Sequence, residues 1–238
     1  MLFRRHQITV NRLVTVAATI VAGLAASNCA SLASGTHDGT LGSLTSLASV
    51  RTASVSEVML GSNGTYIQRL LADRDSTFER WQDSTVQPVR VWIDSGSTVS
   101  GEQSCFPAAV REAFSEWSTT GIPLQFVYVA RPGDADIRVR WTEHLDRKTG
   151  STTWRTDHSG WMTVSEITLA THISSGNALD ARGMRAIALH EVGHALGLSH
   201  SIDAHDIMAP LVRVDDLSET DRNTIKFLYS LPAGHVHP

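Results

Sequence analysis

The most constraining feature of this 238-residue chain is the spacing of three histidines in its C-terminal half. His190 and His194 lie four positions apart, and Glu191 follows the first of them. Residues four apart on an α-helix differ by about 40° around its axis, so both imidazoles would project from one face. Gly197 can adopt a positive φ, which would end the helix and turn the chain so that His200 supplies a third nitrogen. The spacing therefore predicts a helix that stops at a glycine.

These residue types predict a catalytic zinc site. Three histidine nitrogens suit zinc, and three protein ligands leave a fourth coordination position open for water. Glu191 lies beside the first histidine and could take a proton from an activated water without being a ligand. Met208 follows the third histidine, and H-E-x-x-H-x-x-G-x-x-H with a downstream methionine is the metzincin pattern. We expect Gly197, Met208 and Pro210 to support the site, with the methionine as its floor and the proline in its wall.

Composition and charge narrow the classes of function. Lys and Arg total 20 against 24 Asp and Glu, a net charge of −4, so the basic excess that favours nucleic acids or anionic membranes is missing. Two cysteines are too few for a disulfide scaffold or a cysteine-based zinc finger. Eleven histidines, nine of them from His144 onward, indicate metal binding in the C-terminal half.

The N-terminal end has the pattern of a secretory signal. Arg4 and Arg5 precede an apolar run over 13–26, which is shorter than the ~20 residues that a membrane-spanning helix needs. We expect residues 1–30 to direct export, giving a secreted, periplasmic or surface-bound protein.

The fate of Cys29 stays open at the sequence level. The segment Ala26-Ser27-Asn28-Cys29 faintly matches a lipoprotein signal, which would place a lipid anchor on Cys29. Cleavage after Ser27 would instead keep Cys29 as a disulfide partner, and cleavage after Ala33 would leave Cys105 as a lone thiol.

Two segments separate this signal from the compact part of the chain. Residues 31–62 are dominated by Ser, Thr, Gly and Ala, which predicts a linker. Residues 63–87 predict a helical segment, because apolar residues recur at helical spacing over 66–81. This helix could be the remnant of a propeptide or an N-terminal brace, and we favour the brace.

The remainder predicts one α/β (α+β) domain over 88–232, followed by a short tail over 233–238. Residues 142–159 carry turn residues without a clear period. Alternating or helical spacing of apolar residues predicts strands at 89–93, 124–129, 137–141 and 167–173, and helices at 107–117, 181–196 and 218–229. Asp180 is the expected N-cap of the second helix, and Ser218 with Asp221 fits a capping box for the last.

The chain resembles the matrixin branch of the metzincin metalloproteases, most closely its short bacterial members. The residues that carry the resemblance are the run HEVGHALGLSHS over 190–201, the turn over 207–210 and the helix opening over 217–221. A looser match extends over 88–231. The resemblance implies a metzincin, zincin-like fold with a twisted mixed sheet of about five strands, three helices, and the active-site helix beneath a cleft. It also implies one catalytic Zn2+ and an extended protein or peptide substrate along an edge strand.

Some features of that family are missing from the sequence. No propeptide cysteine motif of the PRCGxPD type occurs, and Cys105 fits better as a small packed residue. The sequence does not support an additional structural Zn2+ or Ca2+, because residues 142–172 do not reproduce the family's metal-binding loops. His144, His158 and His172 with Asp157 could ligate a second metal, but surface or core roles are favoured.

The sequence therefore predicts an exported, monomeric zinc metalloendopeptidase with Glu191 as general base. Contact with a membrane is expected only through the signal or a lipid anchor, and no nucleic-acid partner is expected. Two alternatives stay open. One is a zinc-bearing binding module without catalysis, and the other is a surface lipoprotein whose role is adhesion or assembly.

Overall fold

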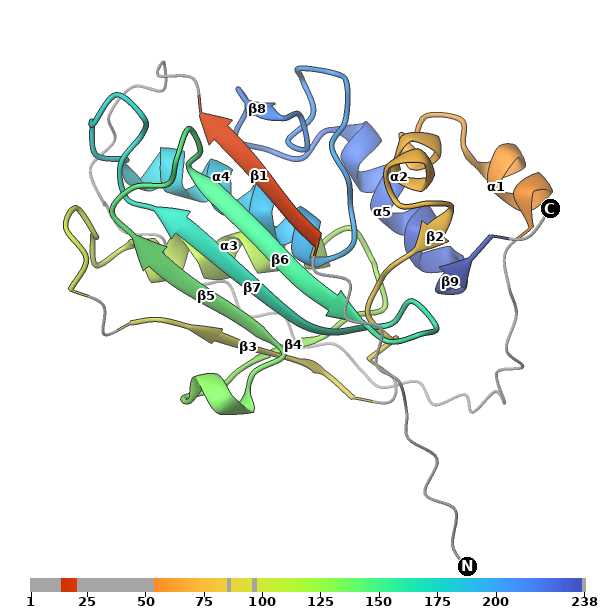
Figure 1. The fold of residues 1–238 in the computed structure, drawn as a ribbon, viewed down its shortest axis with the longest axis horizontal. Helices are drawn as coiled ribbons and strands as arrows, with labels where there is room; N and C mark the ends of the chain where they lie inside the picture. Colours follow the sequence, from red (N-terminus) through yellow and green to blue (C-terminus); the bar gives the residue numbers. More distant parts are fainter. Residues whose placement is uncertain (1–13, 21–53, 85–86, 96–97, 237–238) are drawn as a thin grey trace, which may run out of the picture.

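The computed structural model describes residues 14–20, 54–84, 87–95 and 98–236. Figure 1 shows one twisted sheet, two long helices behind it and a group of helices to one side. The helices behind the sheet are α3 (Phe106–Ser118) and α4 (Ala181–Ala195). The lateral group consists of α1 (Val55–Gly61), α2 (Ile67–Asp73) and α5 (Glu219–Ser230).

Five strands form the mixed sheet that the matrixin resemblance implies. Their order is β4-β3-β5-β7-β6, and neighbours run parallel except β6, which is antiparallel to β7. Their bounds are β3 Val89–Ile93, β4 Phe126–Tyr128, β5 Ile137–Thr142, β6 Gly150–Thr156 and β7 Met162–Ala170. The α/β architecture is thereby confirmed.

Two further strands extend this sheet beyond β6. β1 (Val14–Ile20) pairs antiparallel with β6 and parallel with β8 (Leu211–Val212). A separate ladder joins β2 (Thr77–Phe78) to β9 (Gly234–His235), and a 3-10 turn covers Pro132–Asp134. β1 lies within the apolar run expected to be part of a signal. Residues 1–13 and 21–30 of that signal, Cys29 included, lie outside the described residues, so export stays a prediction.

The core lies between the sheet and the helices α3 and α4, which both pack behind it (Figure 1). Residues 186–195 of α4 are all buried, because the helix packs against both the sheet and α3. Trp117 of α3 donates from Nε1 to the Leu189 carbonyl at 2.9 Å, which ties the two helices together. Burial of this kind fixes the axial and rotational position of α4, and with it the residues that α4 carries.

Helix boundaries follow the local signals where these are strong. The side chain of Asp180 accepts from the Gly183 amide at 2.7 Å, as expected for an N-cap. Ser218 and Asp221 form the predicted capping box of α5. The expected helix over 66–81 is wrong in length, because it ends at Asp73 and the chain then turns through left-handed residues at 75 and 76 (φ 55° and 56°).

Other differences also have physical causes. β6 was missed within 142–159 because its buried positions include Gly150 and Thr152, which give no apolar period. The strand expected at 167–173 lies earlier, at 162–170, and α1 falls inside the expected linker over 31–62. Cys105 is half-buried at the N-cap of α3 and packs against the core as expected, and it is disulfide-bonded and not a free thiol.

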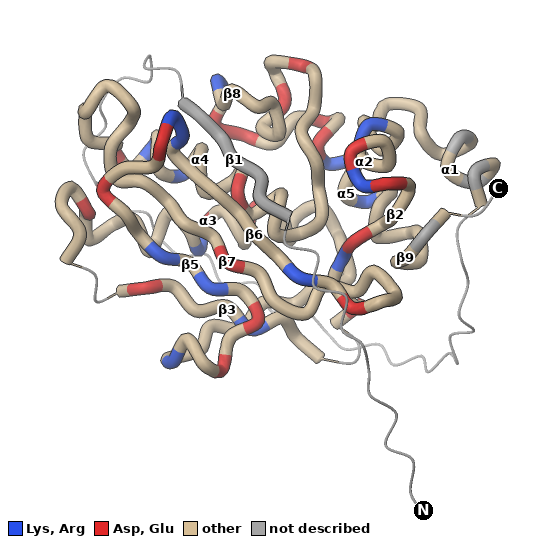
Figure 2. Tube along the Cα trace, in the orientation of Figure 1, with Lys and Arg blue, Asp and Glu red and all other residues tan. Residues whose placement is uncertain are grey.

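Charges are interspersed along the described chain. Figure 2 shows basic and acidic residues scattered over both the sheet and the helices, in agreement with the small net charge. None of the helices in the described ranges is both long enough and apolar enough to span a bilayer.

Candidate metal centre and active site

The chain reverses after α4 in the manner that the histidine spacing predicts. α4 ends at Ala195, and Gly197 has a φ of 107°, which an L-residue with a side chain rarely adopts. The Leu198 amide donates back to the Gly193 carbonyl at 3.0 Å and closes the turn. The turn brings His200 back alongside the helix.

The three histidines converge on one point. Nε2 of His190 and Nε2 of His194 are 2.9 Å apart. The His200 ring centroid lies 5.3 Å from that of His190 and 4.8 Å from that of His194. One ligand atom from each residue lies within 4.8 Å of the others. His190 and His194 are fully buried and His200 is half-buried, so the group is sheltered with one side less enclosed.

Backbone carbonyls set the orientation of the two helical imidazoles. Nδ1 of His190 donates to the Ile207 carbonyl at 2.7 Å, and Nδ1 of His194 donates to the Leu198 carbonyl at 2.8 Å. A carbonyl only accepts, so each Nδ1 carries the proton and each Nε2 presents a lone pair to the common point. This tautomer fits a zinc ion, whose ligands are neutral imidazoles.

Burial keeps these imidazoles neutral. It lowers the pKa of His190 to about 3, with a further lowering from His200, against the hydrogen bond to Ile207. The pKa of His194 is also well below its usual value, chiefly through burial and then through His190. Neutral rings keep the lone pairs that a metal needs.

Glu191 lies beside this point and is held by β6. Its side chain is fully buried, and Thr152 donates from Oγ1 to Oε2 at 2.6 Å. The same hydroxyl lies 3.1 Å from the Glu191 carbonyl. A Cβ on Gly150 would come within 2.3 Å of Oε1, so glycine at that position makes room for the carboxylate. Sequence reasoning missed Thr152 and Gly150 because it missed β6.

Met208 lies directly beneath the helix that carries the histidines. It is fully buried, and a Cβ on Gly193 would lie 2.3 Å from its sulfur, so the methionine packs on the helix backbone. The Met208 carbonyl accepts from the Ser201 amide at 2.9 Å, which joins this turn to the segment after the third histidine. Pro210 is exposed and immediately precedes β8.

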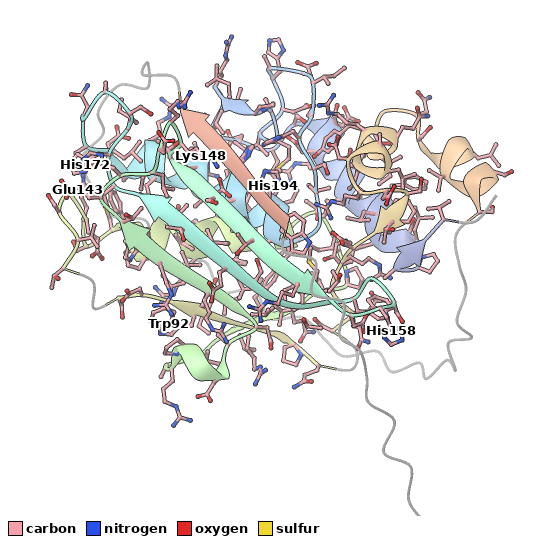
Figure 3. All side chains as sticks on the ribbon, viewed as in Figure 1. Trp92, Glu143, Lys148, His158, His172 and His194 are labelled. Carbon is pink, nitrogen blue, oxygen red and sulfur yellow. The ribbon has the colours of Figure 1, made fainter. Side chains whose placement is uncertain are left out.

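The three histidines considered for a second metal, His144, His158 and His172, lie in two places. Figure 3 shows His158 at one end of the sheet, and Glu143 and His172 together at the other. His144 and His172 have ring centroids 5.1 Å apart, and Nε2 of His144 lies 3.6 Å from a Glu143 oxygen. Ligand atoms of these three residues lie within 4.8 Å of one another. The structure therefore brings together two of the three candidate histidines, with Glu143 in place of Asp157.

Such a site defines a class of protein. A mixed sheet over a central helix bearing H-E-x-x-H, a third histidine after a glycine turn and a buried methionine beneath are the features of a metzincin. The family model described as Matrixin matches residues 80–230. The chain belongs to the matrixin family.

Individual relatives are distant and longer. Matrix metalloproteinase-15 of Homo sapiens is 29% identical over 150 residues, which cover 55% of this chain and 22% of that protein. Metalloendoproteinase 1 of Glycine max is 25% identical over 194 residues, 74% of this chain and 62% of the relative. Matrix metalloproteinase-C of Caenorhabditis elegans is 28% identical over 155 residues, which cover 53% of this chain and 25% of that protein. The chain thus spans between about a fifth and three fifths of these relatives.

Proposed function

We propose that this chain is an exported zinc-dependent endopeptidase, with His190, His194 and His200 as metal ligands and Glu191 as general base. Membership of the matrixin family supports a zinc metallopeptidase. The observation that carries the proposal is the convergence of Nε2 from His190 and Nε2 from His194 at 2.9 Å. Both are held in the metal-binding tautomer beside a buried carboxylate.

Glu191, Thr152 and Met208 would each have a distinct role in hydrolysis. Bound zinc would lower the pKa of a coordinated water and polarise the scissile carbonyl. Glu191 accepts the proton of the attacking water and returns it to the leaving amine. Thr152 keeps Oε2 of Glu191 in place by its hydrogen bond of 2.6 Å, so that the carboxylate acts from one position. Met208 supports the helix backbone below the ligands.

The path of the substrate is suggested by β1. Its residues 14–18 pair antiparallel with β6, and residues 19 and 20 run parallel to β8. The space between β6 and β8 therefore accepts one extended strand directly over α4 (Figure 1). We propose that an extended peptide substrate occupies this place by strand addition once export has removed β1 together with the signal.

A comparison of two chain lengths tests this path. The full chain, in which β1 fills the edge of the sheet, should cleave peptides more slowly than a chain beginning at residue 21, which lacks β1 and keeps both cysteines. Equal rates would contradict the shared position. We further propose that the exported chain acts as a monomer and reaches a membrane only through the signal or a lipid on Cys29.

The activity itself is tested by casein or gelatin zymography with and without a chelator. A clear band that disappears on chelation and returns with added zinc is expected. A metal-loaded protein that binds peptides without cleaving them would favour the alternative of a silent zinc-bearing binding module. Palmitate labelling that depends on Cys29 would support a lipoprotein.

A further inference from the structure

The backbone carbonyls at the C-terminal end of α4 accept hydrogen bonds from side chains in distant parts of the chain. The last carbonyls of a helix have no partner within it. Trp81 donates from Nε1 to the Ala195 carbonyl at 2.7 Å, and Tyr229 donates from its hydroxyl to the Leu196 carbonyl at 3.0 Å. Trp81 belongs to residues 66–81, which we call the N-terminal brace and which also contain Tyr66, Arg74 and Glu79. Most of the brace precedes the residues matched by the family model, 80–230.

Arg74 of the brace shares a carbonyl with a candidate zinc ligand. Its Nη2 donates to the Leu198 carbonyl at 3.0 Å, and the same carbonyl accepts from Nδ1 of His194 at 2.8 Å. A carbonyl oxygen has two lone pairs and can accept both bonds. The guanidinium therefore holds the group that orients His194.

The guanidinium is itself fixed by a buried network. Nη1 of Arg74 lies 3.4 Å from Oε2 of Glu79, and Trp154 donates from Nε1 to the same oxygen at 2.9 Å. The guanidinium carbon stacks 4.6 Å from the centroid of the Trp154 ring. Arg74, Glu79 and Trp154 are all buried. A cation at the C-terminal end of a helix is also favoured by the helix dipole.

The brace also rests on the glycine of the histidine motif. A Cβ on Gly197 would lie 2.3 Å from the backbone carbonyl oxygen of Glu79. The position therefore excludes a side chain for two independent reasons, its φ of 107° and the closeness of the brace. Residues 66–81 and the turn that leads to His200 are packed as one unit.

A second chain of bonds leads from the brace to His190. The Tyr66 hydroxyl donates to Oδ1 of Asp221 at 3.1 Å, and Oδ2 of Asp221 accepts from the Ile207 amide at 2.8 Å. The carbonyl of Ile207 accepts from Nδ1 of His190 at 2.7 Å. The two helical histidines are thus each oriented by a carbonyl whose residue is anchored, directly or through one carboxylate, to the brace.

We propose that Arg74 and Tyr66 are positioning residues of the metal centre, and that the brace is a permanent part of the functional unit and not a removable propeptide. The inference rests on the proposed function only in taking His190 and His194 as zinc ligands. Arg74 acts through Leu198 on His194, and Tyr66 acts through Asp221 and Ile207 on His190. Residues that orient a metal ligand in this way typically change metal affinity by about 10- to 100-fold when removed.

The test is the zinc dissociation constant of the full chain, measured by competition with a chromophoric chelator. The main variant is Arg74→Met with Glu79→Gln, which removes both buried charges together and leaves Trp154 an amide oxygen as acceptor. We expect its zinc dissociation constant to rise about tenfold. The zinc dissociation constant of Arg74→Lys, with Glu79 intact, should lie between those of this double variant and the parent. Lysine keeps a charged donor but lacks the planar guanidinium group.

The matched control is Arg69→Met on the exposed face of α2, where Arg69 pairs only with Asp73 at 3.9 Å among the ion pairs described. It should bind zinc as tightly as the parent. The absorption spectrum of the Co²⁺-substituted protein gives a second readout, which should change in the Arg74 variants and stay constant in Arg69→Met. A folded double variant that binds zinc within twofold of the parent would overturn the role of Arg74.

Tyr66→Phe decides the question if the double variant does not fold. Phenylalanine fills the same volume and loses only the hydroxyl bond to Asp221, so the zinc dissociation constant should rise about two- to threefold. A value equal to that of the parent would overturn the proposal. Zinc affinity is measured without turnover, so a parent that binds zinc and cleaves no peptide would refute the proposed function and leave this inference standing.

Discussion

Two groups of three potential ligands in this molecule have similar spacing and different surroundings. His190, His194 and His200 form one, and Glu143, His144 and His172 form the other; in both, ligand atoms lie within 4.8 Å of one another. The first group lies in the core on α4 and the turn after it. The second lies where β5 and β7 end, and the side chains of Glu143 and His144 are 52% and 54% exposed.

The difference shows that spacing alone does not make a metal centre. In the first group, Nδ1 of His190 and of His194 is held by a carbonyl, so the donor atoms are oriented before a metal arrives. In the second group, Glu143 and His144 would lose side-chain freedom on binding, which costs free energy. We therefore expect stoichiometric zinc at the buried group only.

The largest expected effect comes from deleting one ligand in each group. His194→Ala should lose stoichiometric zinc and all measurable peptidase activity, because two ligands remain and a polar cavity is left. His172→Ala should retain one zinc per chain and the parent's activity. Metal analysis after dialysis, with activity on the same sample, makes the comparison. Two zinc ions per parent chain, with one lost in His172→Ala, would contradict the distinction between the groups.

Acid should destabilise the metal-free core through His190. Its pKa is lowered to about 3 in the folded chain, mainly by burial, against an ordinary value of 6.5. The folded state then binds fewer protons than the unfolded state between these values. This contribution to stability is present above pH 6.5 and is lost as the pH falls toward 3, on the order of a few kcal/mol.

Denaturant unfolding of the metal-free protein from pH 7 to pH 4 measures this loss. His190→Leu places an apolar side chain at the buried position and cannot take up the proton, so the free energy of unfolding of this variant should decrease less steeply as the pH falls. Identical slopes for the parent and His190→Leu would show that other groups govern acid unfolding.

A smaller effect is expected where β6 holds Glu191, the proposed general base. Thr152→Val keeps the shape of the side chain and removes the hydroxyl that donates to Glu191 at 2.6 Å. We expect kcat to fall about tenfold with the zinc content unchanged, since one hydrogen bond to a charged group is lost. Thr153→Val, on the opposite face of the same strand, is the control and should leave kcat unaltered. A Thr152→Val enzyme as fast as the parent would remove Thr152 from the mechanism.

Parts of this arrangement could be predicted because their signals are local. The bounds of α4 follow from the cap at Asp180 and the positive φ of Gly197, and α5 follows from the capping box of Ser218 and Asp221. The convergence of the three histidines follows from their spacing at positions 190, 194 and 200 and from the glycine turn at 197. Each of these signals is decided by a few neighbouring residues.

The parts that could not be predicted depend on contacts between distant segments. β6 is a strand because β7 pairs with it, while Gly150 and Thr152 give no apolar period of their own. The helix in the brace stops at Asp73, so Phe78 reaches the core from the short strand β2 and Trp81 reaches it from the irregular segment that follows. The hydrogen bond from Arg74 to the Leu198 carbonyl joins residues 124 positions apart, and no local sequence pattern predicts it.

The most direct test of the account is Glu191→Gln, with zinc content and peptide turnover measured on the same purified sample. Glutamine keeps the size of the side chain and cannot accept a proton from water. The account predicts one zinc per chain, as in the parent, with turnover lower by about 10²- to 10⁴-fold. Turnover equal to the parent's, or zinc lost together with activity, would contradict the assignment of Glu191 as the general base beside a three-histidine zinc site.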